Sequence, residues 1–154
     1  AGADAILVTC SSIGPAVDLA TSLTSVPVFR VDQPMADEAV RLGRKIGIIA
    51  TLATTLSPTC DLVRRRAEAS GKTVKLNAKL CDGAFEALMS GSSDKHDQMV
   101  KDALKALARE VDVIVLAQAS MARVVNQLDE KDKQLPILSS PELAMRHLAD
   151  KLLD

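Results

Sequence analysis

The residue best suited to carry out chemistry in this sequence is Cys10. It directly follows a short apolar segment and precedes a helix expected to begin near Pro15. At such a turn the unpaired amides of the helix and the positive end of its dipole favour a thiolate, which can act as a nucleophile or as a base toward a carbon acid. Ser11 and Ser12 add hydroxyls that suit a carboxylate. The alternatives are that Cys10 is a small buried apolar residue and that the serines are helix caps.

Two further turns place polar residues after apolar segments. Thr51, Thr54 and Thr55 lie in a hydroxyl-rich stretch after a second apolar segment, and Gln118, Ala119 and Ser120 follow a third. Such residues at the carboxyl ends of parallel strands suit an anionic group, although Thr is also common at strand ends because of its shape. We therefore expect these turns to share a substrate site with Cys10.

The remaining cysteines and the histidines indicate no metal site. Cys60 and Cys81 stand far from each other and from Cys10, without a C-x-x-C pair or a nearby His, which predicts free thiols. Cys60 is expected in the first turn of a helix, where a packed side chain is the ordinary outcome. His96 and His147 have no second ligand close in sequence, so we expect capping or surface roles.

Composition excludes several classes of function. The net charge of −1 comes from 19 basic and 20 acidic residues spread along the chain, and there are two Phe but no Trp or Tyr. Nucleic-acid binding is therefore disfavoured, because neither a basic stripe nor aromatic platforms are present. No apolar run reaches the roughly 20 residues that a membrane span needs, and no signal peptide is apparent. We expect a cytoplasmic protein without a membrane partner.

Short β-branched segments alternate with segments of helical period, which predicts an α/β fold with parallel strands. The expected strands are Ala5–Thr9, Val26–Val31, Lys45–Thr51, Thr73–Leu80, Asp112–Ala117 and Leu135–Leu138. The expected helices are Pro15–Leu23, Met35–Leu42, Pro58–Ser70, Gly83–Met89, Asp94–Glu110, Met121–Glu130 and Pro141–Leu153. Ser57 before Pro58 is a strong signal for a helix start.

The chain contains an internal repeat. Residues 4–12 align with residues 112–120, which matches Asp4 with Asp112 and Cys10 with Gln118, and Val26-Pro27-Val28 aligns with Leu135-Pro136-Ile137 one residue further along. The repeat predicts two related β-α-β units. Chance similarity between strands is the alternative.

The repeat also predicts how the chain is divided. Two strands and their helices precede the second unit, whereas almost nothing precedes Asp4, so we expect a truncated first lobe that lacks on the order of 65 residues. The predicted divisions are residues 1–43 for the rest of the first lobe, 44–139 for the second lobe, and 140–154 for a C-terminal helix that packs back on the first lobe.

Four strings resemble the aspartate/glutamate racemase superfamily, which includes hydantoin racemases, maleate isomerases and arylmalonate decarboxylases. They are VTCSSIGP, VPVFRVDQPMADEAV, KIGIIATLATTLSPT and VIVLAQASM. The resemblance implies two pseudo-symmetric parallel-sheet lobes with helices on both faces, a carboxylate substrate between the lobes, no cofactor and no metal, and homo-oligomers such as dimers. It also implies that Cys10 is catalytic, with Ser11, Ser12, Thr51 and Thr54 binding the substrate.

The resemblance fails at one position. Racemases of this family use a second cysteine on the opposite side of the substrate carbon, and Gln118 occupies that place, beside Ala119 and Ser120. A neutral amide cannot exchange protons with a carbon acid, although it can hydrogen-bond a carboxylate. We expect a cofactor-independent racemase-like isomerase that acts at the α-carbon of a small carboxylic or amino acid. The alternatives are a single-cysteine carbon–carbon lyase and a non-catalytic carboxylate-binding relative.

Overall fold

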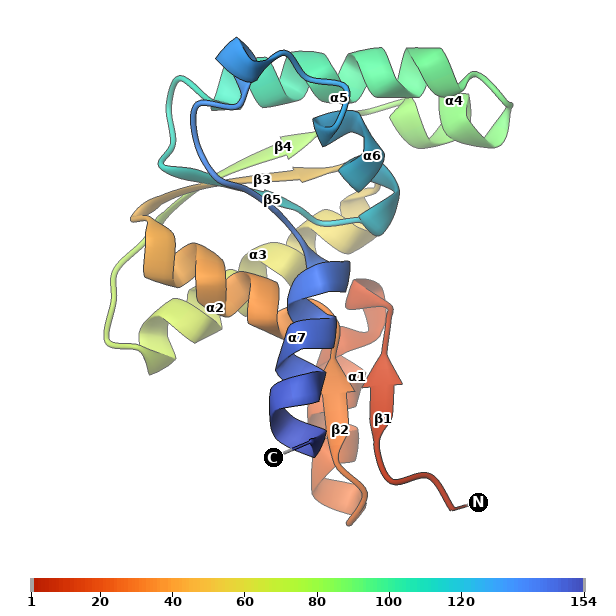
Figure 1. Cartoon of the computed structure of the whole chain (residues 1–154), viewed down its shortest axis with the longest axis vertical. Helices are drawn as coiled ribbons and strands as arrows, with labels where there is room; N and C mark the ends of the chain where they lie inside the picture. Colours follow the sequence, from red (N-terminus) through yellow and green to blue (C-terminus); the bar gives the residue numbers. More distant parts are fainter. Residues whose placement is uncertain (1, 154) are drawn as a thin grey trace.

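The computed structural model describes residues 2–153, which form two parallel β-sheets joined by helices (Figure 1). A small sheet pairs β1 (Ile6–Val8) with β2 (Val28–Arg30). A larger sheet has the order β4-β3-β5-β6, in which these strands are Lys75–Leu80, Lys45–Ala50, Val113–Leu116 and Ile137–Ser139. Each of the six predicted strands is present, and the parallel α/β class is confirmed.

Helices cover both faces of the larger sheet. In chain order the helices are α1 (Gly14–Ala20), α2 (Gln33–Leu42), α3 (Ala53–Ala69), α4 (Ala84–Met89), α5 (Ser93–Leu107), α6 (Ala122–Val125) and α7 (Ser140–Leu152). Residues of α2 and α3 form one core with β3 and β5, and residues of α5 form the other (Figure 1). Within residues 2–153, none of the helices has the length and apolarity to cross a membrane.

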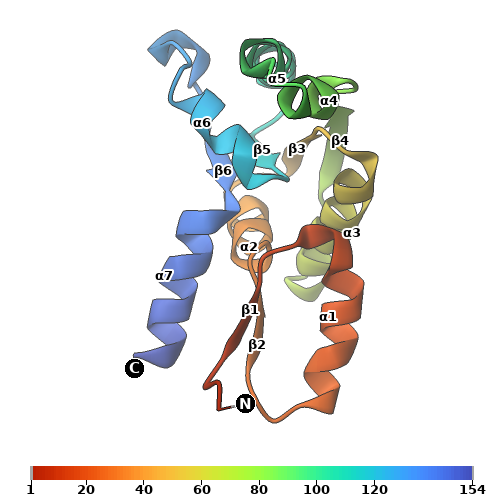
Figure 2. The same cartoon turned by 90° about the vertical axis from the view of Figure 1, so that its right-hand side faces the viewer.

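The small sheet lies between α1 on one side and α7 on the other (Figure 2). The ring of Phe29 on β2 meets that of His147 on α7 edge-on, with 6.0 Å between ring centroids. Helix α2 packs against both α3 and α7, and its buried residues belong to the core of the larger sheet. The divisions proposed at residues 43 and 139 stay predictions, since α2 contacts elements of both sheets.

Two helices differ from their predicted bounds by more than three residues, and the other five differ by three or fewer. Helix α3 begins at Ala53 and not at Pro58, because the N–H groups of Thr55 and Leu56 already donate to the carbonyl of Leu52, at 3.1 and 3.0 Å. Pro58 therefore lies inside the helix, where it lacks the N–H for one backbone hydrogen bond. Helix α6 ends at Val125, and the chain continues irregularly to a 3₁₀ turn at Glu130–Asp132.

The strand register confirms the internal repeat. Ile6, Leu7 and Val8 pair with Val28, Phe29 and Arg30, and Ile114, Val115 and Leu116 pair with Ile137, Leu138 and Ser139. The N–H of Ile6 donates to Pro27 and that of Ile114 to Pro136, both at 2.9 Å. The two β-α-β units therefore share one hydrogen-bond pattern across 108 residues of sequence.

A buried charge cluster holds the small sheet against its neighbours. Arg30 is 6% exposed and donates to both carboxylate oxygens of Asp32 at 2.9 Å and to Asp18 at 2.9 Å. Asp18 on α1 also accepts from Arg65 on α3, at 2.7 Å. Gly14 makes room for the guanidinium, because a Cβ at this position would lie 2.1 Å from Arg30 Nη2. The cluster thus links α1 and β2 to α3, which covers one face of the larger sheet.

The pKa of Asp18 reflects this cluster. Burial opposes ionisation of the carboxyl, but hydrogen bonds from Arg65 and Arg30 outweigh it, and the pKa of Asp18 is lowered. A carboxyl whose pKa is lowered by folding stabilises the native state above its unfolded pKa, and this contribution is lost as the pH falls through the folded value. The link between α1 and α3 is therefore expected to weaken in acid.

Removal of Arg30 tests how much the charge cluster contributes to the stability of the fold. Arg30→Ala leaves Asp32, which is 1% exposed, as a buried charge without its partner, so we expect the free energy of unfolding to fall by about 3 kcal/mol. Urea unfolding followed by circular dichroism measures the change. Arg41→Ala is the matched control, because Arg41 pairs with Glu38 on the surface and its loss should leave the midpoint unchanged. Equal effects of the two substitutions would contradict the prediction.

Candidate active site

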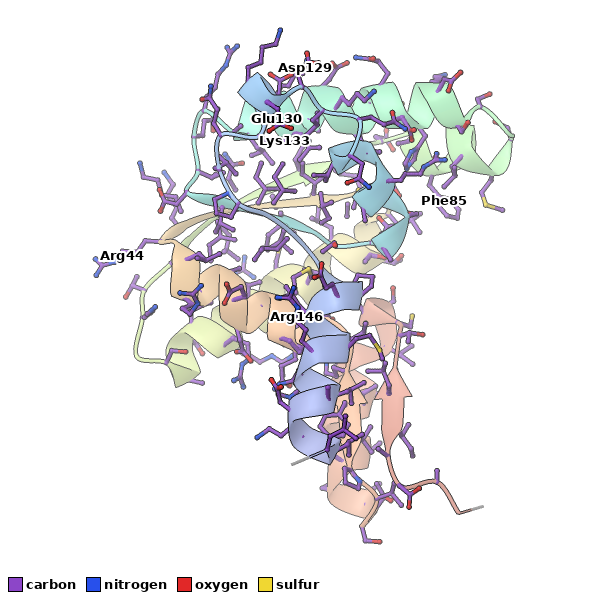
Figure 3. All side chains as sticks on the ribbon, viewed as in Figure 1. Arg44, Phe85, Asp129, Glu130, Lys133 and Arg146 are labelled. Carbon is purple, nitrogen blue, oxygen red and sulfur yellow. The ribbon has the colours of Figure 1, made fainter. Side chains whose placement is uncertain are left out.

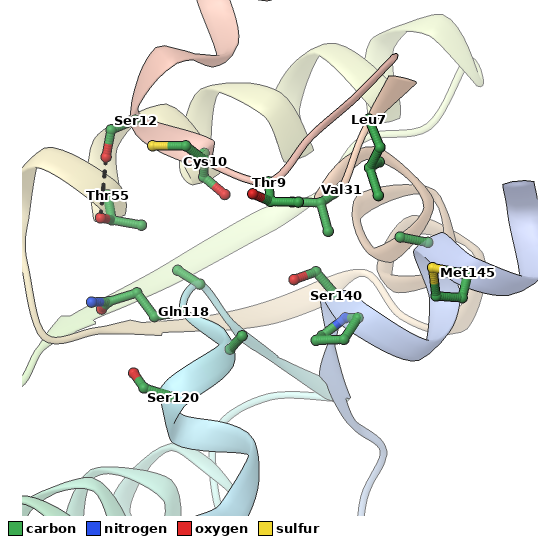
Figure 4. A pocket seen from close by; sticks show the side chains of 15 residues that line it. Leu7, Thr9, Cys10, Ser12, Val31, Thr55, Gln118, Ser120, Ser140 and Met145 are labelled. Carbon is green, nitrogen blue, oxygen red and sulfur yellow. Dashed lines mark hydrogen bonds between the residues drawn. The ribbon is translucent and has the colours of Figure 1, made fainter. Parts of the chain in front are cut away.

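A cavity of about 420 Å³ lies between the two sheets, where the carboxyl ends of β1, β5 and β6 meet (Figure 4). Turns after these strands supply its polar wall, and α7 supplies part of its apolar wall. The lining residues are Leu7, Thr9, Cys10, Ser11, Ser12, Val31, Thr55, Ala117, Gln118, Ala119, Ser120, Ser140, Pro141, Ala144 and Met145. The structure therefore brings together two turns that are 108 residues apart in sequence.

Cys10 is the exposed thiol of this cavity. It lies two residues after the end of β1 in an extended conformation and precedes a 3₁₀ turn, Ser11–Ile13, that leads into α1. The other two cysteines are buried, and burial raises the pKa of the Cys60 and Cys81 thiols, which disfavours their thiolates. Cys60 lies well inside α3 and not in its first turn, so the expected position of this residue was wrong. Among the described thiols, Cys10 alone combines exposure with a place in the cavity wall.

Gln118 faces the same cavity in a defined orientation. Its Oε1 accepts two hydrogen bonds from Thr51, one from the backbone N–H at 2.6 Å and one from the hydroxyl at 3.0 Å. Because a backbone N–H can only donate, the atom beside it must be the amide oxygen. The Nε2 group has no partner among residues 2–153, so Gln118 can only present hydrogen-bond donors to the cavity.

The structure places some of the predicted hydroxyl residues in the cavity wall and others outside it. Ser11, Ser12 and Ser120 line the cavity. Thr51 does not line it but donates hydrogen bonds to Gln118, and Thr54 is also not part of the wall. Thr54 is displaced because α3 begins at Ala53, which turns residue 54 away in the first helical turn.

Thr55 lies in the wall in place of Thr54, and its hydroxyl is 3.4 Å from that of Ser12 (Figure 4). Ser140, at the start of α7, was not predicted as a site residue. The rule that ligands bind after parallel strands would have indicated it, because Ser140 directly follows β6. The apolar wall from α7 has no comparable signal in the sequence.

No charged side chain lines the cavity among the residues described. Charged groups such as Arg44, Asp129, Glu130 and Lys133 lie on the outside of the larger sheet and its helices, and Arg146 extends from α7 (Figure 3). Residues 2–153 also hold no group of three His, Cys, Asp or Glu suited to a metal ion. The described wall would therefore hold a carboxylate through hydroxyls, backbone N–H groups and the amide of Gln118.

Comparison with known proteins agrees with this geometry. The family model for Asp/Glu/hydantoin racemases matches residues 1–148, and no curated protein sequence matches the chain. A glutamate racemase from Bacillus anthracis superposes with a TM-score of 0.75 at 22% identity, over 97% of this chain and 58% of that one. A glutamate racemase from Francisella tularensis, in complex with D-glutamate, gives 0.74 at 16% identity, over 97% and 57%.

An allantoin racemase from Klebsiella pneumoniae has a TM-score of 0.72 at 19% identity, over 99% of this chain and 60% of that one. The chain thus spans less than two thirds of the length of these structures, and identities this low show a shared fold. The family match covers nearly all residues of the chain. Together with the facing strand ends and the turn at Cys10, it shows that this chain belongs to the Asp/Glu/hydantoin racemase family.

Proposed function

We propose that this protein is a cofactor-independent, racemase-like isomerase that uses a single thiol, Cys10, at the α-carbon of a small carboxylic or amino acid. The observation that carries the proposal is the arrangement of the cavity. An exposed thiol lies in one wall, and Gln118, with its oxygen occupied by Thr51, lies in another. One wall can therefore exchange a proton with carbon, and the other can only donate hydrogen bonds.

The chemical step follows from these two groups. The Cys10 thiolate removes the α-proton, so that the C–H bond breaks, an S–H bond forms, and the electron pair moves into the carboxylate to give an enediolate. Donors fixed before the reaction stabilise this charge at little cost of reorganisation. Gln118 Nε2 and the hydroxyls of Ser12 and Ser140 are among the donors that line the cavity. Return of the proton from Cys10 restores the starting enantiomer. Isomerisation requires that a water molecule on the side of Gln118 protonates the opposite face of the enediolate, and the hydroxide that this leaves takes the proton from Cys10 to regenerate the thiolate.

A single thiol restricts the outcome of this reaction. Gln118 cannot deliver a proton to the opposite face, because an amide has no accessible pKa near neutrality. Protonation from one face also suits the alternative lyase, in which loss of carbon dioxide from a malonate produces the same enediolate. The second alternative, a carboxylate-binding protein without turnover, is favoured by the same replacement of the second cysteine. Exchange of the α-proton, or release of carbon dioxide from a malonate, separates the enzymes from the binding protein.

Cys10→Ala tests the role of the thiol. In deuterium oxide, the wild-type protein should exchange the α-proton of at least one substrate among glutamate, aspartate and related small acids, as followed by proton NMR. The variant should lose about 10²–10⁴-fold of this rate, because it has no base at the carbon. Cys81→Ala, a change at a buried thiol outside the cavity, should keep it.

Retained exchange in Cys10→Ala would remove this residue from the mechanism. Saturable binding of carboxylates by calorimetry, with no exchange and no release of carbon dioxide from an arylmalonate, would instead identify the binding protein.

Gln118→Cys tests the restriction to one face. The wild type should incorporate deuterium faster than it loses optical activity, because Cys10 returns the proton to the same face more readily than water delivers one to the opposite face. A thiol at residue 118 can protonate the other face, so the variant should lose optical activity at least about tenfold faster, as followed by polarimetry. Gln118→Ala is the matched control, since it removes the donor without adding a thiol. Equal loss of optical activity in the wild type and in Gln118→Cys would contradict the prediction.

A further inference from the structure

The helix that follows the second strand of each β-α-β unit begins in a similar way. Helix α2 follows β2 and begins with Gln33-Pro34, and α7 follows β6 and begins with Ser140-Pro141. The residue directly before the helix differs in charge, since it is Asp32 for α2 and Ser139 for α7. The two helix starts can therefore be compared position by position.

The start of α2 holds a carboxylate that belongs to the chain itself. Asp32 is 1% exposed, and Arg30 balances its charge by donating to both carboxylate oxygens at 2.9 Å. The positive end of a helix dipole stabilises a negative group at this place. A buried carboxylate at the start of this helix is thus part of the fold.

The start of α7 lacks a carboxylate of this kind. Ser139 and Ser140 are neutral, and no side chain of residues 2–153 caps the first turn. The side chain of Glu142, the acidic residue of this turn, is 73% exposed and accepts a hydrogen bond from Arg146 on the surface. The N–H groups of a first helical turn have no partner within their own helix. The positive end of α7 is therefore open to a negative group from outside the helix.

A buried hydroxyl lies at this open end. Ser140 is 7% exposed, it lines the cavity, and its hydroxyl has no hydrogen-bond partner among residues 2–153. Figure 4 shows the hydroxyl pointing into the cavity. Buried polar side chains normally have a partner, so this hydroxyl is a donor available to a ligand in the cavity.

We propose that the start of α7 is a carboxylate subsite, in which Ser140 donates its hydroxyl and the helix presents its positive end to one carboxylate of a small organic acid. The bound carboxylate takes the place at α7 that the side chain of Asp32 takes at α2. Binding of the acid is independent of the proposed reaction. One consequence rests on the proposed function, which is that the same donors stabilise the charge that develops on this carboxylate in the enediolate.

Titration with sodium propionate tests the subsite, because this acid carries one carboxylate and no other charge. In the ¹⁵N-labelled protein the amide proton of Glu142 should shift downfield in a saturable manner, since its N–H belongs to the open end of α7. Ser140→Ala should weaken the affinity about tenfold, because it removes a hydrogen bond to a charged group. Ser93→Ala is the matched control and should keep the affinity, since Ser93 is the first residue of α5 and does not line the cavity.

Three outcomes overturn the proposal. These are no saturable shift at Glu142, equal affinity of Ser140→Ala and the wild type for propionate, and equal affinity of the wild type for propionamide, which has a similar shape without the charge. The first and third are measured on the wild type, so they decide the matter even if Ser140→Ala does not fold. The readout is binding and not turnover, so failure here leaves the role of Cys10 in the proposed function to its own test.

Discussion

The candidate site depends on one property of parallel strands, which is that all of them end at the same edge of a sheet. Each strand is followed by a turn and a helix, so the polar residues after successive strands gather at that edge. In this protein two sheets present their carboxyl ends to a common cavity. Cys10 after β1, Gln118 after β5 and Ser140 after β6 meet there, although they lie far apart in the sequence.

Repetition of the backbone does not repeat the chemistry. Cys10 and Gln118 have similar extended conformations, with φ and ψ of −125° and 110° and of −134° and 134°, and each precedes a 3₁₀ turn. Their surroundings differ, because β3 brings Thr51 to Gln118 and no described strand brings a donor to Cys10. One scaffold therefore supports an open thiol on one side and a tethered amide on the other, and this asymmetry is the basis of the one-thiol proposal.

The position of the small sheet relative to the larger one rests on packing and on charge. Helix α2 contributes buried residues to the core of the larger sheet and also contacts α7, while Arg30, Asp18 and Arg65 connect β2, α1 and α3. Arg30 is buried and donates to both carboxylate oxygens of Asp32, so its guanidinium is held in one orientation toward Asp18. The cavity lies between the elements that these contacts hold, and its shape depends on them.

The sequence by itself determined the strands, the repeat and the residues at the turn of Cys10. These depend on local apolar patterns and on the period of each element, so strands such as Lys45–Ala50 and Val113–Leu116 were predictable to within a residue or two. The match between residue 10 and residue 118 was visible for the same reason. The start of α3 was not, because Ser57 and Pro58 carry a helix-start signal that the backbone bonds at Leu52 override.

Only the tertiary structure decided how the amide of Gln118 is oriented and which threonine enters the cavity. Each of these depends on contacts between residues far apart in sequence, such as Thr51 with Gln118 and Ser12 with Thr55. Local propensity contains no information about such contacts, since they form only when the strands have been placed side by side.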